Sequence, residues 1–459
     1  MNLGQLTIVQ FHGGVGEIGG NKILISDRSS KVFLDFGKSY SREQEFFDFP
    51  LLQARQPKHL KGLGILPDLK GLYKDEEGDH GIDAVVLSHP HGDHWEYARF
   101  IKDDVPIHCA PITRDVILAR ERSSKAAGLS VDYKVANLTK ERGPEVFKTF
   151  LEITPEVPHH AGGLAVRAYE VDHSIPGCYG LIVETGEGNI VYTGDLRFEG
   201  PRSSVTQEFV NRAKEAEPNT LIVEGTNVGE AQISSEDEVQ KKVGSIVRFS
   251  TQLVIGSFSS GDTQRIDTFL TVAKTHGRKL ALSMKQAFMI NELTRNSSYR
   301  GPTLDDADIL IFEKGKKTTS EYEKQISARY GSKIVDSTDV NQMQDKVILA
   351  AGFYDFNELI DLAPNSGSIF VMSQSEPFNE EMEIDYKKMG HWLEHYGLPL
   401  YQVHASGHAK PHELKNFIAT VKPKKAYLIH TASPDLYKRY LGDLGIETIV
   451  PQLSKDYEL

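Results

Sequence analysis

Short apolar runs separated by glycine occupy the first 36 residues of the chain. The runs LTIVQF, KILIS and KVFLDF, at residues 6–11, 22–26 and 31–36, predict strands of an antiparallel sheet joined by tight turns. The run IDAVVLS at 82–88 predicts a buried strand, and the pattern over 112–127 predicts a helix. Strands are expected again between residues 164 and 195, in LAVRAYEV, GLIVET and NIVYTGD. The segment 40–80 is rich in proline and charge, which predicts an irregular insertion or a lid.

The pattern changes near residue 205, where short continuous apolar runs begin to alternate with helical stretches such as 263–276. Strands buried on both faces and separated by helices are typical of a parallel α/β sheet. The runs that predict these strands are TLIVEG, QLVIGSF, KLALS, DILIF, KVILAA and SIFVMS. The last part of the chain offers PLYQVHASGHA, a helix over 412–420, and the apolar run AYLIH.

Length and composition narrow the class of protein. A chain of 459 residues is too long for one ordinary core, so two domains are expected. The 39% hydrophobic and 25% charged residues are typical of soluble globular proteins, and no apolar run reaches the roughly 18 residues of a membrane span. We therefore expect a cytoplasmic protein without a membrane partner, with Cys109 and Cys178 as free thiols. The net charge of −12 argues against a protein that coats nucleic acid, but it does not exclude a nuclease.

A dense histidine cluster follows the predicted strand at 82–88. The sequence SHPHGDH at 88–94 supplies three imidazoles and a carboxylate on one short loop, and zinc binds both ligand types. His89 and His91 are two residues apart, so extended backbone points them to one side, whereas Asp93 and His94 follow the turn. The loop therefore predicts ligands for two metal ions. An ordinary structural role does not explain four such residues at this spacing.

Three more ligand candidates each end a predicted buried strand. His173 ends YEVDH, Asp195 ends NIVYTGD and His430 ends AYLIH, and a carboxylate such as Asp195 can bridge two cations. Four other histidines have no such supporting neighbours and are interpreted as structural; they are His12, His108, His159 and His160.

The segment 14–19, GVGEIG, fits the GxGxxG pattern of dinucleotide-binding proteins. That fingerprint needs a helix directly after it, and residues 21–26 instead predict a strand. We interpret these glycines as positions that turn with positive φ or approach another group closely.

These motifs resemble the metallo-β-lactamase-fold hydrolases. HPHGDH matches the HxHxDH signature of that family, Asp35 in FLDFG looks like its first motif, and His173 and Asp195 match its third and fourth motifs. The resemblance implies an αββα sandwich and a supporting carboxylate at Asp35. An alternative role for Asp35 is to cap the turn at Gly37.

The second half resembles the β-CASP branch of that family, and ribonuclease J in particular. Glu224 in EGTN, His408 in HASGHA and His430 look like the three motifs of this branch, and SFSSGDTQRI at 257–266 is similar to the segment that shapes the phosphate pocket of ribonuclease J. The resemblance implies an α/β fold with metallo-β-lactamase parts at 1–210 and 399–459 and an inserted β-CASP domain at 211–398. It departs from ribonuclease J where Trp95 and Glu96 follow the histidine loop.

The resemblance implies a two-zinc phosphodiesterase acting on RNA, a 5′–3′ exoribonuclease with possible endonuclease activity. Histidine at position 430 favours RNA over DNA, manganese is an alternative metal, and a homodimer is a further possibility. Metal ligands are expected at His89, His91, Asp93, His94, His173, Asp195 and His430; catalytic roles at Asp35, Asp93, Glu224 and His408; and phosphate or RNA contacts at His404, Ser406, Gly407, Ser259 and Ser260. The same metal site also suits a hydrolase of small phosphodiesters or esters, since a fold alone does not decide the substrate. For Glu224 a capping role, and for the two serines an ordinary turn role, are the alternatives.

Overall fold

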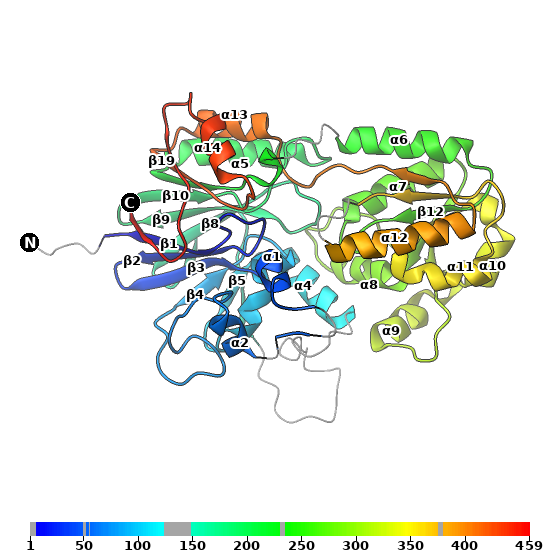
Figure 1. Ribbon diagram of the computed structural model, residues 1–459, viewed down its shortest axis with the longest axis horizontal. Helices are drawn as coiled ribbons and strands as arrows, with labels where there is room; N and C mark the ends of the chain where they lie inside the picture. The colour runs from blue at the N-terminus through cyan, green and yellow to red at the C-terminus, as the bar shows by residue number, and fades with distance from the viewer. Residues whose placement is uncertain (1–5, 49–51, 55, 124–147, 230–234, 375–379) are drawn as a thin grey trace, which may run out of the picture. The chain divides into compact units, whose positions relative to one another are not determined.

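The computed structural model describes residues 6–48, 52–54, 56–123, 148–229, 235–374 and 380–459. The chain forms two compact units (Figure 1). The first unit comprises Met1–His173, Gly177–Gln232 and Gly407–Leu459, and the second comprises Ser174–Pro176 and Ile233–Ser406. No helix among the described residues is both long enough and apolar enough to cross a membrane.

One sheet of the first unit is built from the N-terminal strands. Its strand order is β21-β1-β2-β3-β4-β5-β6; the first three strands along the chain pair antiparallel, and β3 to β6 pair in parallel. The antiparallel entry predicted from the glycine-separated runs is thus confirmed. The strands span β1 Ile8–Gly13, β2 Lys22–Asp27, β3 Ser30–Phe36, β4 Ala84–Val86, β5 Ile107–Cys109, β6 Phe150–Glu152 and β21 Asp456–Glu458.

The second sheet of the first unit has the strand order β20-β19-β11-β10-β9-β8-β7. Its strands span β7 His159–Ala161, β8 Leu164–Glu170, β9 Tyr179–Thr185, β10 Gly188–Tyr192, β11 Thr220–Val223, β19 Lys425–Leu428 and β20 Glu447–Ile449. β11 pairs in parallel with β10 and β19. The first unit therefore continues past the boundary expected at residue 210, because the run TLIVEG completes this sheet and not the sheet of the inserted part.

The two sheets face each other and carry helices on their outer sides (Figure 1). Phe11 of β1 contacts Tyr427 of β19, with ring centroids 5.1 Å apart. On the outer side of the second sheet, Phe209 of α5 lies against Gly180 and stacks on Phe417 of α13. A fully buried phenylalanine stabilises the fold by about 1.5–3 kcal/mol. The predicted αββα sandwich is confirmed. The helices of this unit are α1 Tyr40–Gln44, α2 Pro57–Gly62, α3 Gly92–Trp95, α4 Pro111–Ser123, α5 Ser203–Glu215, α13 Pro411–Val421 and α14 Pro434–Tyr440, with 3₁₀ turns at Glu96–Phe100 and Thr226–Val228.

The segment 40–80 packs into the hydrophobic core and does not stand apart as a lid. Leu60, Leu72 and Tyr73 are fully buried in one cluster with Phe33 of β3 and Ile117 of α4. The helix predicted over 112–127 is α4, and residues 124–127 lie outside the described part of the chain. Cys109 and Cys178 are buried and form no disulfide, as expected.

The second unit is a doubly covered parallel sheet, in agreement with its continuous apolar runs. Its strand order is β15-β14-β13-β16-β12-β17-β18, and all neighbouring strands are parallel. Ile255, Leu349 and Phe370 pack in its core with Met389 and Leu393 of α12. The strands span β12 Val254–Ser257, β13 Lys279–Ser283, β14 Ile309–Phe312, β15 Ile334–Val335, β16 Val347–Ala350, β17 Ile369–Met372 and β18 Leu400–Gln402. The helices span α6 Glu236–Phe249, α7 Thr263–Thr275, α8 Met284–Leu293, α9 Glu321–Tyr330, α10 Ser337–Gln342, α11 Leu359–Leu362 and α12 Glu380–His395, with 3₁₀ turns at Gly331–Lys333, Gln344–Lys346 and Phe353–Glu358.

Candidate metal centre

The ends of six strands carry the side chains of the candidate centre. The loop 88–94 follows β4 and leads into α3, and the other segments leave β3, β8, β10, β11 and β19. Parallel strands end at one edge of a sheet, so their following loops meet there. The residues that these strand ends contribute are Asp35, His89, His91, Asp93, His94, His173, Asp195, Glu224 and His430.

All seven predicted metal ligands come together in the first unit. Their ligand atoms form two sets, each with all atoms within 4.8 Å of one another. The first ligand set is His89, His91, His173 and Asp195, and the second ligand set is Asp93, His94, Asp195 and His430. Asp195 belongs to both sets, and apart from the partly exposed His91 and Asp93 the members are buried.

Unpaired buried atoms in this cluster fit a bound cation. Nε2 of His89, Nε2 of His94 and Oδ1 of Asp195 have no hydrogen-bond partner among the described residues. Both imidazole nitrogens lie near Oδ2 of Asp195, at 3.4 Å for His89 and 3.2 Å for His94. Buried polar atoms are nearly always satisfied, and imidazole with carboxylate is a donor set that zinc prefers. The residues therefore fit divalent cations.

The protonation of three of these groups, His91, His173 and Asp195, also suits a metal. Burial lowers the pKa of His91 and of His173 well below the usual histidine value, so both rings are neutral and offer a lone pair. Burial alone would raise the pKa of Asp195, but the neighbouring imidazoles of His430, His94 and His89 hold it well below its usual range. Asp195 is thus an ionised carboxylate between the two ligand sets.

Asp35 forms hydrogen bonds with the histidine loop at Ser88 and His94. Its Oδ1 accepts a hydrogen bond from the Ser88 amide at 2.7 Å, and its Oδ2 accepts from Nδ1 of His94, also at 2.7 Å. The hydroxyls of Ser88 and Tyr192 donate to Oδ2 as well, at 2.7 and 2.6 Å. The amide of Gly37 instead donates to the carbonyl of Asn21, so the described geometry gives Asp35 no capping role at that turn.

A second carboxylate, that of Glu224, contacts His408. Oε2 of Glu224 lies 2.9 Å from Nδ1 of His408 and accepts a hydrogen bond from Thr226 Oγ1 at 2.8 Å. Thr226 Oγ1 also lies 2.8 Å from Nδ1 of His430. Burial lowers the pKa of His408, but Glu224 and Asp195 outweigh this effect and raise it to about 9. Glu224 also accepts from the amides of Leu196 and Thr226, so its carboxylate contacts both the His408 imidazole and the backbone.

The predicted phosphate-binding residues are divided between the units. The carbonyl oxygen of Gly407 accepts a hydrogen bond from Nδ1 of His173, which leaves Nε2 of that ring to the first ligand set. His404 and Ser406 are partly buried after β18, in the second unit. Ser259 and Ser260 follow β12, where the Ser259 hydroxyl accepts from the Gly261 amide at 3.3 Å, a turn contact.

Several supporting residues were missed by the sequence reasoning. Ser88 adjoins the histidine loop and Tyr192 precedes Asp195 by three residues, but neither carries a ligand group that marks it. Thr226 is two residues after Glu224 in EGTN, and it was not predicted as a site residue. The four histidines interpreted as structural lie outside both ligand sets; His108 bonds to His159 at 2.7 Å, and His12 lies 3.1 Å from the Ser454 hydroxyl.

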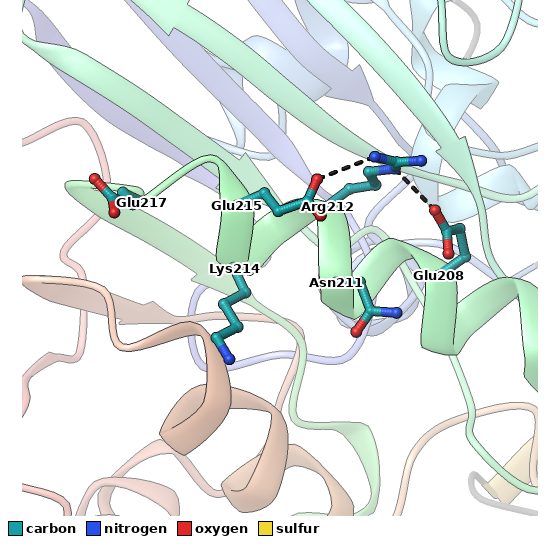
Figure 2. A pocket seen from close by; sticks show the side chains of 6 residues that line it. All are labelled: Glu208, Asn211, Arg212, Lys214, Glu215 and Glu217. Carbon is teal, nitrogen blue, oxygen red and sulfur yellow. Dashed lines mark hydrogen bonds and ion pairs between the residues drawn. The ribbon is translucent and has the colours of Figure 1, made fainter.

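A separate surface pocket of about 610 Å³ lies along α5 (Figure 2). It is lined by Glu208, Asn211, Arg212, Lys214, Glu215 and Glu217. Arg212 forms ion pairs with Glu208 at 2.8 Å and with Glu215 at 3.0 Å, so its charge is compensated within the helix. None of these residues belongs to a ligand set.

Comparisons with known proteins agree with this geometry. Residues 71–239 match the family model described as "Beta-lactamase superfamily domain", and residues 399–451 match the one described as "Zn-dependent metallo-hydrolase RNA specificity domain". Curated proteins named Ribonuclease J align over most of the chain: that of Mycoplasma pneumoniae is 24% identical over 91% of this chain, and that of Sinorhizobium meliloti is 24% identical over 96%. The chain is a ribonuclease J-like protein of the β-CASP type. The family predicted from the motifs is thus confirmed.

The ribonuclease J-like chain spans about two thirds of the length of these relatives, 66% of the M. pneumoniae protein and 72% of the S. meliloti protein. A solved structure described as a protein of unknown function from Enterococcus faecalis V583 shares the fold, with a TM-score of 0.76 and 20% identity over 99% of this chain and 100% of that one. The zinc-dependent family model and the two ligand sets together indicate a divalent-metal site.

Proposed function

We propose that this ribonuclease J-like protein is a two-zinc ribonuclease that hydrolyses phosphodiester bonds of RNA, primarily as a 5′–3′ exoribonuclease. The observation that carries the proposal is the pair of ligand sets that share Asp195, together with the buried Nε2 atoms of His89 and His94, which have no hydrogen-bond partner among the described residues. The match to the RNA-specificity model supports RNA as the substrate, since residues 399–451 include His408 and His430.

The first ligand set would hold one ion, the second would hold the other, and Asp195 would contact both. Zinc is the proposed metal, and manganese is the alternative that the oxygen ligands Asp93 and Asp195 allow. Such a pair of cations, when bound, supplies an activated water and neutralises charge on the phosphate.

The remaining residues would orient the reacting groups. Asp35 fixes the ring of His94, and the Gly407 carbonyl fixes the ring of His173. Glu224 and Thr226 orient His408, which we assign as the hydrogen-bond donor to the phosphate and the proton donor to the leaving 3′ oxygen. Phosphate binding at His404, Ser406, Gly407, Ser259 and Ser260 is part of the same proposal; the homodimer and the cytoplasmic location stay predictions from the sequence.

The test is cleavage of end-labelled RNA that carries a 5′ monophosphate, with added zinc or manganese and with a chelator. We expect mononucleotides from the 5′ end, and loss of cleavage in His91→Ala and His408→Ala. His160→Ala is the control, because His160 is an exposed histidine outside both ligand sets. Internal fragments would change the mode of cleavage to endonucleolytic. A protein that holds two metals, leaves RNA intact and cleaves bis(p-nitrophenyl) phosphate would refute the RNA assignment in favour of a small phosphodiester.

A further inference from the structure

The loop at residues 13–20, called the glycine loop here, contains the GxGxxG segment and joins β1 to β2. Four of its glycines, Gly14, Gly16, Gly19 and Gly20, have φ between 69° and 83°. No helix follows the loop, so the phosphate-binding explanation of the motif does not apply. The loop instead contacts two other segments of the chain, one that carries Asp93 and one that carries His430.

Gly19 lies directly against the Asp93 side chain. A Cβ atom added at Gly19 would lie 2.5 Å from Oδ2 of Asp93 and 2.7 Å from its Cβ. Rotation of the aspartate does not relieve the second contact, because the position of Cβ is fixed by the backbone. The Asn21 amide next to the loop donates to the Asp93 carbonyl at 3.1 Å, which holds the two segments together.

Gly14 contacts the segment that carries His430. Its carbonyl oxygen accepts a hydrogen bond from the His430 amide at 2.8 Å. His430 has φ of 51°, a left-handed conformation that a non-glycine residue keeps only when its surroundings impose it. Nε2 of His430 lies 3.3 Å from Oδ2 of Asp93, so the glycine loop contacts two members of the second ligand set that face each other.

Two buried charged residues anchor the glycine loop. Glu17 accepts hydrogen bonds from the hydroxyls of Ser39 and Ser41, the latter at 2.9 Å, and the Gly14 amide lies 3.4 Å from its Oε1. The ammonium group of Lys22 donates to the Gly20 carbonyl at 2.9 Å. Burying charged groups is costly, and these are satisfied by bonds that fix the loop. The loop therefore cannot retreat from Asp93 without breaking its bond to His430.

We propose that the glycine loop is the positioning element of the second ligand set, with Gly19 leaving the space in which Asp93 binds its metal ion. The inference rests on the proposed two-metal function. Among the described residues, the glycine loop makes no hydrogen bond to His89, His91 or His173. An added methyl group at Gly19 displaces either Asp93 or the glycine loop, and the loop would move His430 with it. Both outcomes weaken the same metal site.

The test compares Gly19→Ala with Gly16→Ala in the full chain. Gly16 is a matched control, since it has φ of 69° in the same loop and a Cβ there would meet nothing within 4 Å. Zinc bound at equilibrium is measured by mass spectrometry, with chelator competition for each affinity and circular dichroism of the metal-free proteins for folding. We expect Gly19→Ala to bind one ion about 10- to 100-fold more weakly and the other as wild type does. Gly16→Ala is expected to hold two ions with wild-type affinities.

Two results would overturn the proposal: wild-type affinity for both ions in Gly19→Ala, or an equal loss of both ions. If Gly19→Ala does not fold, Glu17→Ala loosens the same loop, and retention of both ions in that variant overturns the proposal as well. A wild-type protein that holds fewer than two ions removes its premise and also overturns it. Because the measurement uses no RNA, a wild-type protein with two ions that cleaves no RNA refutes the proposed RNA substrate and leaves this inference standing.

Discussion

The carboxylate of Asp35 lies 2.7 Å from Nδ1 of His94. When Nδ1 of a neutral ring donates this hydrogen bond, Nε2 is the nitrogen left with a lone pair, and it lies 3.2 Å from Oδ2 of Asp195. The same carboxylate accepts from the Ser88 amide, so it fixes the start of the loop that carries His89. Asp35 has φ of 57°, a strained conformation for a non-glycine residue, so its backbone is held in place by these bonds at the end of β3.

Asp35→Asn is expected to weaken zinc binding about 10- to 100-fold. The NH2 group of asparagine is a donor, so it cannot accept the hydrogen bonds that one carboxylate oxygen of Asp35 accepts. A buried donor left without an acceptor also costs about 1–3 kcal/mol of unfolding free energy. Chelator competition measures the affinity and urea unfolding measures the stability. Asp83→Asn is the control, since Asp83 also accepts a backbone hydrogen bond, from Lys31 at 2.8 Å, but is exposed. Unchanged zinc affinity in Asp35→Asn would refute the supporting role.

Glu224 is expected to act through His408. Glu224→Gln should lower kcat on RNA by at least about tenfold with both metals retained, because the imidazole loses the carboxylate that orients and charges it. His408→Gln should lower kcat at least as much. The double variant should be no slower than His408→Gln alone, since residues that act as a unit are not additive. Additive losses in this kinetic cycle would show that Glu224 acts independently, through its bonds to the Leu196 and Thr226 amides.

Removal of the metals should destabilise the protein. Zinc at 1,000 times its Kd stabilises a folded protein by about 4 kcal/mol, so the chelated protein is expected to melt at a clearly lower temperature. Asp195→Asn should lose most of this difference, since Asp195 belongs to both ligand sets. Scanning calorimetry with and without chelator checks both expectations. Equal melting temperatures of the metal-loaded and chelated wild-type protein would contradict the assignment of the ligand sets.

The residues that gather at the candidate metal centre were more predictable from sequence than the pairing of the strands. His173, Asp195 and His430 each follow a buried strand, and apolar runs ending in a ligand residue are visible without a structure. The strand β11 was assigned to the wrong sheet, because a continuous apolar run shows burial on both faces but not which neighbours it pairs with.

Contacts between segments far apart in the sequence were not predictable. The glycines at 14–19 were correctly interpreted as positions of positive φ, but nothing in the sequence indicates that Gly19 lies against Asp93, 74 residues later. Thr226 bridges His408 and His430 from a position 182 and 204 residues away. Such contacts depend on how the loops of separate strands meet, and the local sequence pattern does not predict which loops meet.

The pair His108 and His159 predicts an acid-sensitive fold. Burial and the neighbouring His159 lower the pKa of His108 from 6.5 to about 4, and Nδ1 of His108 lies 2.7 Å from Nε2 of His159. Since the folded state holds His108 neutral while the unfolded state takes up a proton near pH 6.5, stability present above pH 6.5 is lost as the pH falls toward 4. After allowance for solvent screening the loss is about 1–2 kcal/mol.

Urea unfolding of wild type and His108→Asn between pH 7.5 and 4.5 measures this loss. The stability advantage of wild type over His108→Asn should shrink as the pH falls, because the variant has no imidazole to protonate at this position. His12 has its pKa lowered to about 4 by burial too, but it contributes equally to both proteins and cancels in the difference. His391→Asn, at an exposed histidine of α12 in the second unit, should follow wild type at every pH. A difference between wild type and His108→Asn that stays constant with pH would show that the histidine pair is not the acid-sensitive element.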